Sequence, residues 1–141
     1  MKKIILLVIV LAIGFMSFAQ DPQIHIKLRT KTLVQKEQSM DSVTSLVFTS
    51  HDLRRGKLRF KYRNASADSG LNRSFMIENS AGQELFRSDG SGFKIKASKL
   101  KKMLRSSALK VYTMAIPSDP AKAAIVRVRR IEIAELSLMG N

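Results

Sequence analysis

The stretch KLRFKYR, residues 57 to 63, alternates apolar and basic side chains without a break. The apolar phase contains Leu58, Phe60 and Tyr62, and the basic phase contains Lys57, Arg59, Lys61 and Arg63. Successive side chains of a β-strand point to opposite faces of its sheet. The alternation therefore predicts a half-buried strand with one apolar face and one basic face.

Other segments show the same character. Residues 23–34, QIHIKLRTKTLV, alternate with period two and predict one further half-buried strand. Residues 93–97, FKIKA, alternate in the same way. Residues 42–50 are rich in β-branched and apolar side chains, and Gly56 allows a turn before the next strand. We therefore expect residues 42–50 and 57–63 to form a hairpin.

Helix signals are few. Ser98 is expected to cap a helix over residues 98–105, in which apolar side chains recur at helical spacing. Asp119 followed by Pro120 predicts a single helical turn. The last element, residues 125–138, predicts a strand with a bulge at Arg129 and Arg130, where the apolar phase changes.

About eight short strands with turns between them, and no alternation of strands with helices, indicate an all-β protein. The expected fold is an antiparallel two-sheet sandwich of about the size of an immunoglobulin domain. A small outer-membrane barrel is the alternative, because its strands alternate too. Such barrels carry aromatic girdles at both membrane interfaces, whereas this chain has no Trp and two Tyr.

The N-terminus resembles a secretory signal. Lys2 and Lys3 precede an uncharged apolar run, residues 4–16, and Ala19 ends a small-residue cleavage site. We expect a cleavable signal helix, residues 1–19, followed by one β-sandwich domain, residues 20–141. A retained membrane anchor is the alternative, although the apolar run is shorter than the roughly 20 residues that a span needs. The short, Lys-led signal is typical of bacteria and predicts a periplasmic or secreted protein.

The chain is strongly basic and has no cysteine. Its formal net charge is +14 at pH 7. Small exported domains with weak cores usually carry disulfides. Apolar strand faces alone must therefore stabilise this one.

No catalytic, cofactor-binding or metal-binding residue is predicted. A serine nucleophile needs an activating base, and the chain has two histidines, His25 and His51. His25 falls on the charged face of a strand, and His51 with Asp52 falls in a turn, where Asp is common. The two histidines do not give a zinc-ligand spacing, and residues 89–92 contain too few carboxylates for a calcium loop. We therefore expect a protein that is not an enzyme.

The cations are the remaining candidates for a site. The candidate anion-binding residues are Lys57, Arg59, Lys61, Arg63, Arg127 and Arg129. Shorter basic rows occur at Lys27, Arg29 and Lys31, and at Lys94 and Lys96. Export argues against nucleic acid as the partner, and Phe60 and Tyr62 lie in the apolar phase rather than on a stacking surface.

Two functions follow from these observations. The first is an exported interaction or structural module that binds another protein of the bacterial envelope, for example by strand addition at a sheet edge. The alternative is a binding module for anionic glycan, lipopolysaccharide or lipid head groups. The alternative requires the basic rows to merge into one patch, whereas the first permits them to spread over both outer faces.

Overall fold

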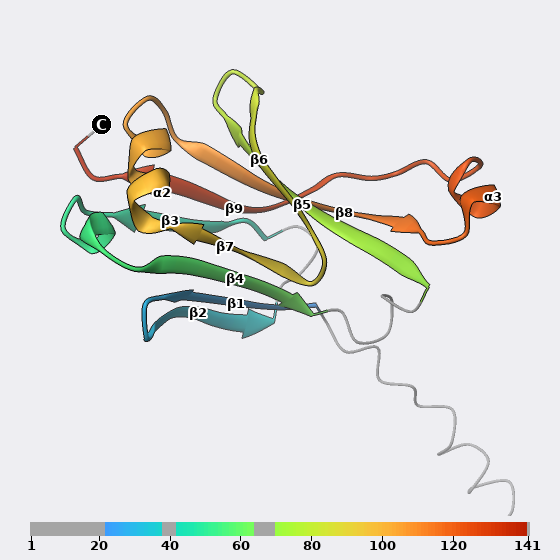
Figure 1. The fold of residues 1–141 in the computed structure, drawn as a ribbon, viewed down its shortest axis with the longest axis horizontal. Helices are drawn as coiled ribbons and strands as arrows, with labels where there is room; N and C mark the ends of the chain where they lie inside the picture. Colours follow the sequence, from blue (N-terminus) through green and yellow to red (C-terminus); the bar gives the residue numbers. More distant parts are fainter. Residues whose placement is uncertain (1–21, 38–41, 64–69, 141) are drawn as a thin grey trace, which may run out of the picture.

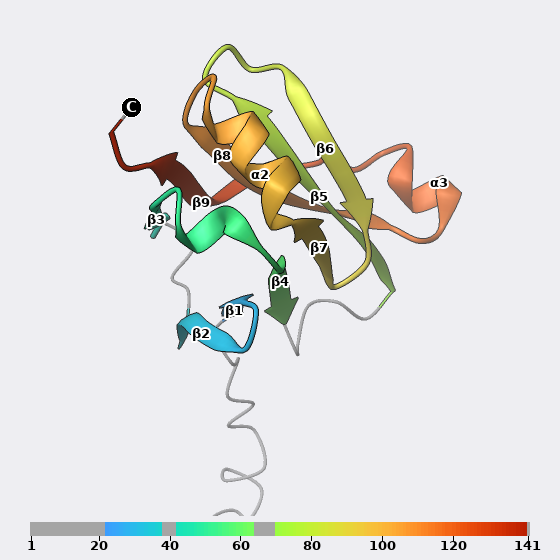
Figure 2. The ribbon, with the colours of Figure 1, turned by 60° about the vertical axis from the view of Figure 1, so that its left-hand side comes forward.

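The computed structural model describes residues 22–37, 42–63 and 70–140, which form two β-sheets and short helices (Figures 1 and 2). The elements in chain order are β1 (Gln23–Leu28), β2 (Lys31–Glu37), β3 (Thr44–Phe48), the 3-10 helix η1 (Asp52–Arg54), β4 (Lys57–Arg63), β5 (Leu71–Asn79), β6 (Glu84–Asp89), β7 (Gly92–Lys96), α2 (Ala97–Leu104), β8 (Leu109–Pro117), α3 (Pro120–Ala123) and β9 (Ile131–Leu138). The first sheet, sheet A, has the order β2-β1-β4-β7, and the second, sheet B, has the order β3-β9-β8-β5-β6. The all-β, two-sheet prediction is confirmed, while the predicted signal peptide lies outside the described residues.

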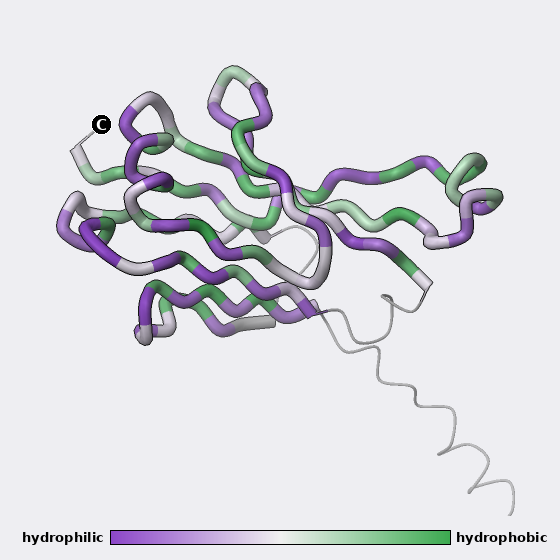
Figure 3. Tube along the Cα trace, in the orientation of Figure 1, coloured by the Kyte–Doolittle hydropathy of each residue, from purple (hydrophilic) through white to green (hydrophobic). Residues whose placement is uncertain are grey.

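β4 is the strand that the opening alternation predicts. Its apolar side chains are buried and its cations are exposed along the whole strand. Figure 3 shows the same alternation along the neighbouring strands of sheet A. β4 lies in the interior of this sheet, antiparallel to β1 on one side and to β7 on the other.

The core lies between the two sheets. Phe60 of β4 stacks on Phe93 of β7, with ring centroids 5.1 Å apart. Both rings contact Phe75 of β5, which belongs to sheet B. Leu100 and Leu104 of α2 are fully buried in the same cluster. Burial of these apolar side chains supplies the main driving force for folding in a chain without disulfides.

The prediction of one strand over residues 23–34 is wrong, because the chain turns there. β1 and β2 form an antiparallel hairpin, and Arg29 adopts a left-handed conformation with φ of 58°. Such a backbone usually calls for glycine or asparagine. An arginine in that position gives no turn signal, so the continuing alternation conceals the break.

The predicted hairpin of residues 42–50 and 57–63 is also wrong. β3 lies in sheet B and β4 in sheet A, and the connection between them contains η1, whose Leu53 is buried in the core. β3 pairs with β9 in parallel, which differs from the expected antiparallel sandwich. Every other strand pair in the described residues is antiparallel. The described residues contain nine strands rather than the expected eight or so.

The helices and the last strand refine the sequence predictions. α2 begins at Ala97, and its N-cap, Lys96, makes no side-chain capping bond, so Ser98 is not the cap. The predicted cap of α3 is confirmed, because the Asp119 carboxylate accepts a hydrogen bond from the backbone N–H of Ala121. Among the described residues, no helix is long and apolar enough to cross a membrane.

The final strand is shorter than expected and its bulge lies elsewhere. Residues 125–130 are not part of a strand, and β9 begins at Ile131. The register against β8 shifts between Val111 and Tyr112, which leaves Ile133 as the extra residue. Ile133 and the following Ala134 are both buried, as a bulge permits. A bulge at Arg129 and Arg130 is therefore wrong.

Candidate functional site

The strand order of sheet A brings three of the basic rows together. Arg59 of β4 is paired with Lys27 of β1 on one side and with Lys94 of β7 on the other. Lys57 is paired with Lys96 in the same way. These side chains share the outer face of the sheet, since the residues that alternate with them are buried. The rows of β1, β4 and β7 therefore form one surface.

We call this surface the basic face. It consists of Lys27, Lys57, Arg59, Lys61, Arg63, Lys94 and Lys96. Side chains on one face of a strand repeat about every 6.7 Å, and neighbouring strands lie about 4.8 Å apart. The basic face is therefore about 20 Å long and 10 Å wide. Lys27, Lys94 and Lys96 are part of the basic face but are not among the candidate residues that the sequence predicts. Their place beside β4 follows only from the strand order of sheet A.

Acids are scarce within the strands of sheet A. The strands of sheet A contain a single acidic residue, Glu37, which is the last residue of β2 and is paired with Gln23. No ion pair within the described part of the chain involves a cation of the basic face. Like charges that lie directly opposite each other on neighbouring strands destabilise a sheet. The arrangement around Arg59 therefore carries a cost in stability.

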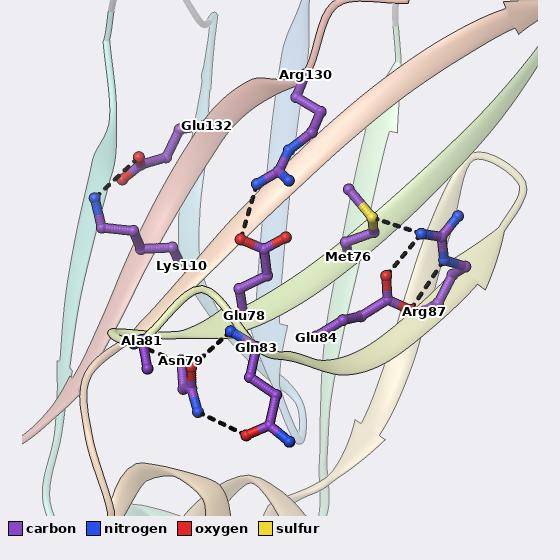
Figure 4. Close-up of polar contacts among 10 residues, drawn as sticks. All are labelled: Met76, Glu78, Asn79, Ala81, Gln83, Glu84, Arg87, Lys110, Arg130 and Glu132. Carbon is purple, nitrogen blue, oxygen red and sulfur yellow. Dashed lines mark hydrogen bonds and ion pairs between the residues drawn. The ribbon is translucent and has the colours of Figure 1, made fainter.

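Several cations in or next to the strands of sheet B are arranged differently, as Figure 4 shows. Arg130 forms an ion pair with Glu78 at 2.8 Å, and Lys110 forms one with Glu132 at 3.2 Å. Glu132 raises the pKa of Lys110, chiefly through the hydrogen bond between them. Within β6, Arg87 donates to Glu84 and lowers the pKa of that carboxyl. Arg87, Lys110 and Arg130, in or next to the strands of sheet B, thus have acidic partners.

Arg127 and Arg129 do not join the basic face. Both are exposed in the irregular segment between α3 and β9. This segment leads into sheet B, and α3 projects from the end of the sandwich beyond β8 (Figure 1). Ile125 beside them is 84% exposed. The candidate set therefore divides into four residues of β4 that lie together and two that lie elsewhere. Arg29 occupies the β1–β2 turn, and Lys31 begins β2.

Asp52 has a structural role. Its carboxylate accepts hydrogen bonds from the hydroxyl and the backbone N–H of Thr49, at 2.6 and 2.8 Å. These bonds hold the pKa of Asp52 below its ordinary value, with the hydroxyl making the larger contribution. The expectation that Asp52 serves a turn beside His51 is therefore confirmed.

His25 lies on the outer face of β1, between Gln35 of β2 and Lys61 of β4. In the described ranges, no three His, Asp or Glu side chains are grouped as a metal site requires. Comparison with models of known protein families gives no match, and no curated protein sequence is significantly similar to this chain. The basic face is therefore the feature from which a function can be argued.

Proposed function

We propose that this protein is a non-catalytic binding module whose basic face holds an anionic glycan polymer or the charged head groups of lipids. The observation that supports this proposal is the merging of the basic rows of β1, β4 and β7 on one outer face. A protein-binding module permits scattered rows, whereas a polyanion requires adjacent ones. The proposal therefore places the anion-binding alternative above the protein partner that the sequence favours first.

The surface chemistry supports an extended ligand. Closely spaced cations attract a polyanion from a distance, and each contact with a fixed anionic charge releases counterions. Phe60 and Tyr62 are buried, so the aromatic rings of β4 are not offered for base stacking. This favours sulfated or phosphorylated glycans and acidic lipid surfaces over single-stranded nucleic acid.

A matched pair of charge reversals tests this function. In the first variant Lys57, Arg59 and Lys61 become Glu, and in the second Lys99, Lys101 and Lys102 of α2 become Glu. Both variants lower the net charge by the same amount, so long-range attraction falls about equally. We expect the first variant to lose binding to heparin and to vesicles rich in anionic lipid far more than the second. Equal losses with retained fold would contradict a localised site.

Salt dependence provides an independent measurement. Contacts at discrete charges give a steep, linear fall of the logarithm of affinity with the logarithm of salt concentration. A diffuse field is instead screened over about 8 Å at physiological ionic strength. The first variant should therefore show a shallower salt slope than the wild-type protein, and the α2 variant should keep the wild-type slope.

A protein partner at the edge of sheet B is the second candidate. β3 is an edge strand, with β9 as its neighbour within the described residues, and Val47 is 60% exposed there. Exposed edge strands accept a further strand from another chain. A photo-crosslinking residue at Val47, in protein expressed with its own leader, should give one discrete adduct. A residue at Lys122 should give none, and identical adduct patterns would contradict this candidate.

The proposed place of action is the bacterial periplasm or the cell exterior. Protein expressed in a bacterium with its own leader should appear outside the cytoplasm, with its N-terminus within a few residues of Gln20. Intact mass measures the cleavage site. Uncleaved chain in the membrane fraction would indicate an anchored protein instead.

A further inference from the structure

The turn between β6 and β7 lies at one end of the basic face, where backbone hydrogen bonds hold it in place. The backbone N–H of Tyr62 donates to the carbonyl of Ser91 at 2.9 Å, and the N–H of Gly90 donates to the carbonyl of Arg73 at 2.8 Å. At Gly92 a Cβ would overlap the carbonyl oxygen of Phe60, so the turn touches β4 directly. These contacts hold the exposed Ser91 beside the cations of β4.

A recess of about 320 Å³ lies next to this turn. Its lining residues are Gln23, His25, Lys61, Tyr62, Arg63 and Ser91. The side chains of β1, β4 and the turn thus offer an amide, an imidazole, an ammonium, a guanidinium and a hydroxyl. None of the lining residues is acidic. The recess is therefore lined by hydrogen-bond donors, two of which, Lys61 and Arg63, carry a positive charge.

His25 adds a second observation. Its Nε2 atom is buried and has no hydrogen-bond partner within the described residues. Buried polar atoms in folded proteins nearly always have a partner, so an unpartnered one calls for an explanation. The described residues therefore leave one side-chain nitrogen of His25 without a partner, and the same side chain lines the recess.

The neighbouring recess has a different chemistry. It measures about 360 Å³ and shares Lys61 and Ser91 with the first, but it is also lined by Asp89. A carboxylate at the rim repels an incoming anion, although Arg59 and Lys94 line the same recess. An anionic group is therefore better placed in the recess of His25.

We propose that the recess formed by His25, Lys61, Arg63 and Ser91 is a subsite for one phosphate or sulfate ester group of the bound ligand. Arg63 supplies a planar fork, and Lys61 supplies a compact charge. The Ser91 hydroxyl adds a third donor, and three donors suit a tetrahedral group with three free oxygens better than a planar carboxylate. This inference rests on the proposed function, since it names the group that anchors the ligand on the basic face.

The test compares two double variants that remove equal charge from the basic face. Lys61→Gln with Arg63→Gln empties the subsite, whereas Lys94→Gln with Lys96→Gln leaves it intact. Calorimetry at physiological salt would use three probes: a short polyphosphate, a heparin-derived oligosaccharide, and phosphatidylcholine vesicles containing phosphatidic acid. Loss of charge-assisted hydrogen bonds predicts that the first double variant binds about tenfold or more weakly. The second should lose several-fold less.

Ser91→Ala removes a hydroxyl without changing charge, and it should weaken binding about threefold while the melting temperature stays the same. Loss with the soluble probes would identify a free ester group on a polymer, and loss confined to vesicles would identify a lipid phosphate. Equal losses in both double variants, with Ser91→Ala silent, would overturn the subsite and leave the proposed function standing. Failure of the wild-type protein to bind any of the probes would overturn both.

Discussion

Arg59 offers a test of whether the basic face is maintained at the expense of stability. It is paired with Lys27 on β1 and Lys94 on β7, so it has a like charge directly opposite on each side. Arg59→Glu turns both repulsive pairs into attractive ones. A cross-strand charge pair is worth about 0.2–1 kcal/mol, and exposure to solvent reduces this value. We therefore expect the free energy of unfolding to rise by about 1 kcal/mol.

For a chain of this size, that increase corresponds to a melting temperature about 4 °C higher. Thermal unfolding followed by circular dichroism at low salt measures it. Lys122→Glu in α3 is the matched control, because it makes the same change in net charge away from sheet A. The gain should shrink in 1 M salt, where the screening length is about 3 Å. The same variant should bind polyanions more weakly. A melting temperature no higher than that of the control would refute the idea that the basic face is destabilising.

Three further predictions concern stability. Phe60→Ala should lower the free energy of unfolding by about 3–5 kcal/mol, because Phe60 is 1% exposed and packs on Phe93 and Phe75, and denaturant titration would measure the loss. Gly92→Ala should cost about 3 kcal/mol in the same assay, since the new Cβ meets the backbone of β4, whereas Ser91→Ala should change stability little. Asp52→Ala should lower the melting temperature by a few degrees at neutral pH. The folded-state pKa of Asp52 is depressed below its ordinary value of 3.8, so its contribution is present above 3.8 and is lost as pH falls through the lower folded value. The difference in melting temperature between the two proteins should therefore shrink as pH falls below 3.8.

The alternation of the sequence predicts faces well but partners poorly. Every residue of β4 has the burial that its phase predicts, because alternation is a local property of an extended chain. The β1–β2 turn at Arg29 escapes prediction, since a left-handed arginine follows no composition rule. The parallel pairing of β3 with β9 escapes for another reason. Strand direction depends on contacts between distant segments, which neither strand's own pattern records.

For the candidate site too, the sequence predicts which side chains point outward but not which strands lie side by side. The outward direction of Lys57, Arg59 and Lys61 follows from the sequence alone. That Lys27 and Lys94 flank Arg59 follows only from the order β1-β4-β7, which places segments more than thirty residues apart side by side. The sequence groups Arg127 and Arg129 with them, because both sets alternate with apolar residues. The structure separates them, since residues 125–130 do not continue β9.

The position of β4 within sheet A decides how its cations are interpreted. Lysines on exposed strands often protect sheet edges from pairing with other chains, and this would explain a basic strand without a ligand. The edges of sheet A are β2 and β7, whereas β4 has a hydrogen-bonded neighbour on both sides. Edge protection therefore does not account for Arg59 or Lys61. A need for a polar outer face does not require unpaired cations, because the strands of sheet B combine Lys110 with Glu132 in an ion pair. The anionic ligand that we propose would neutralise the row, and this would account for adjacent like charges in the middle of one sheet.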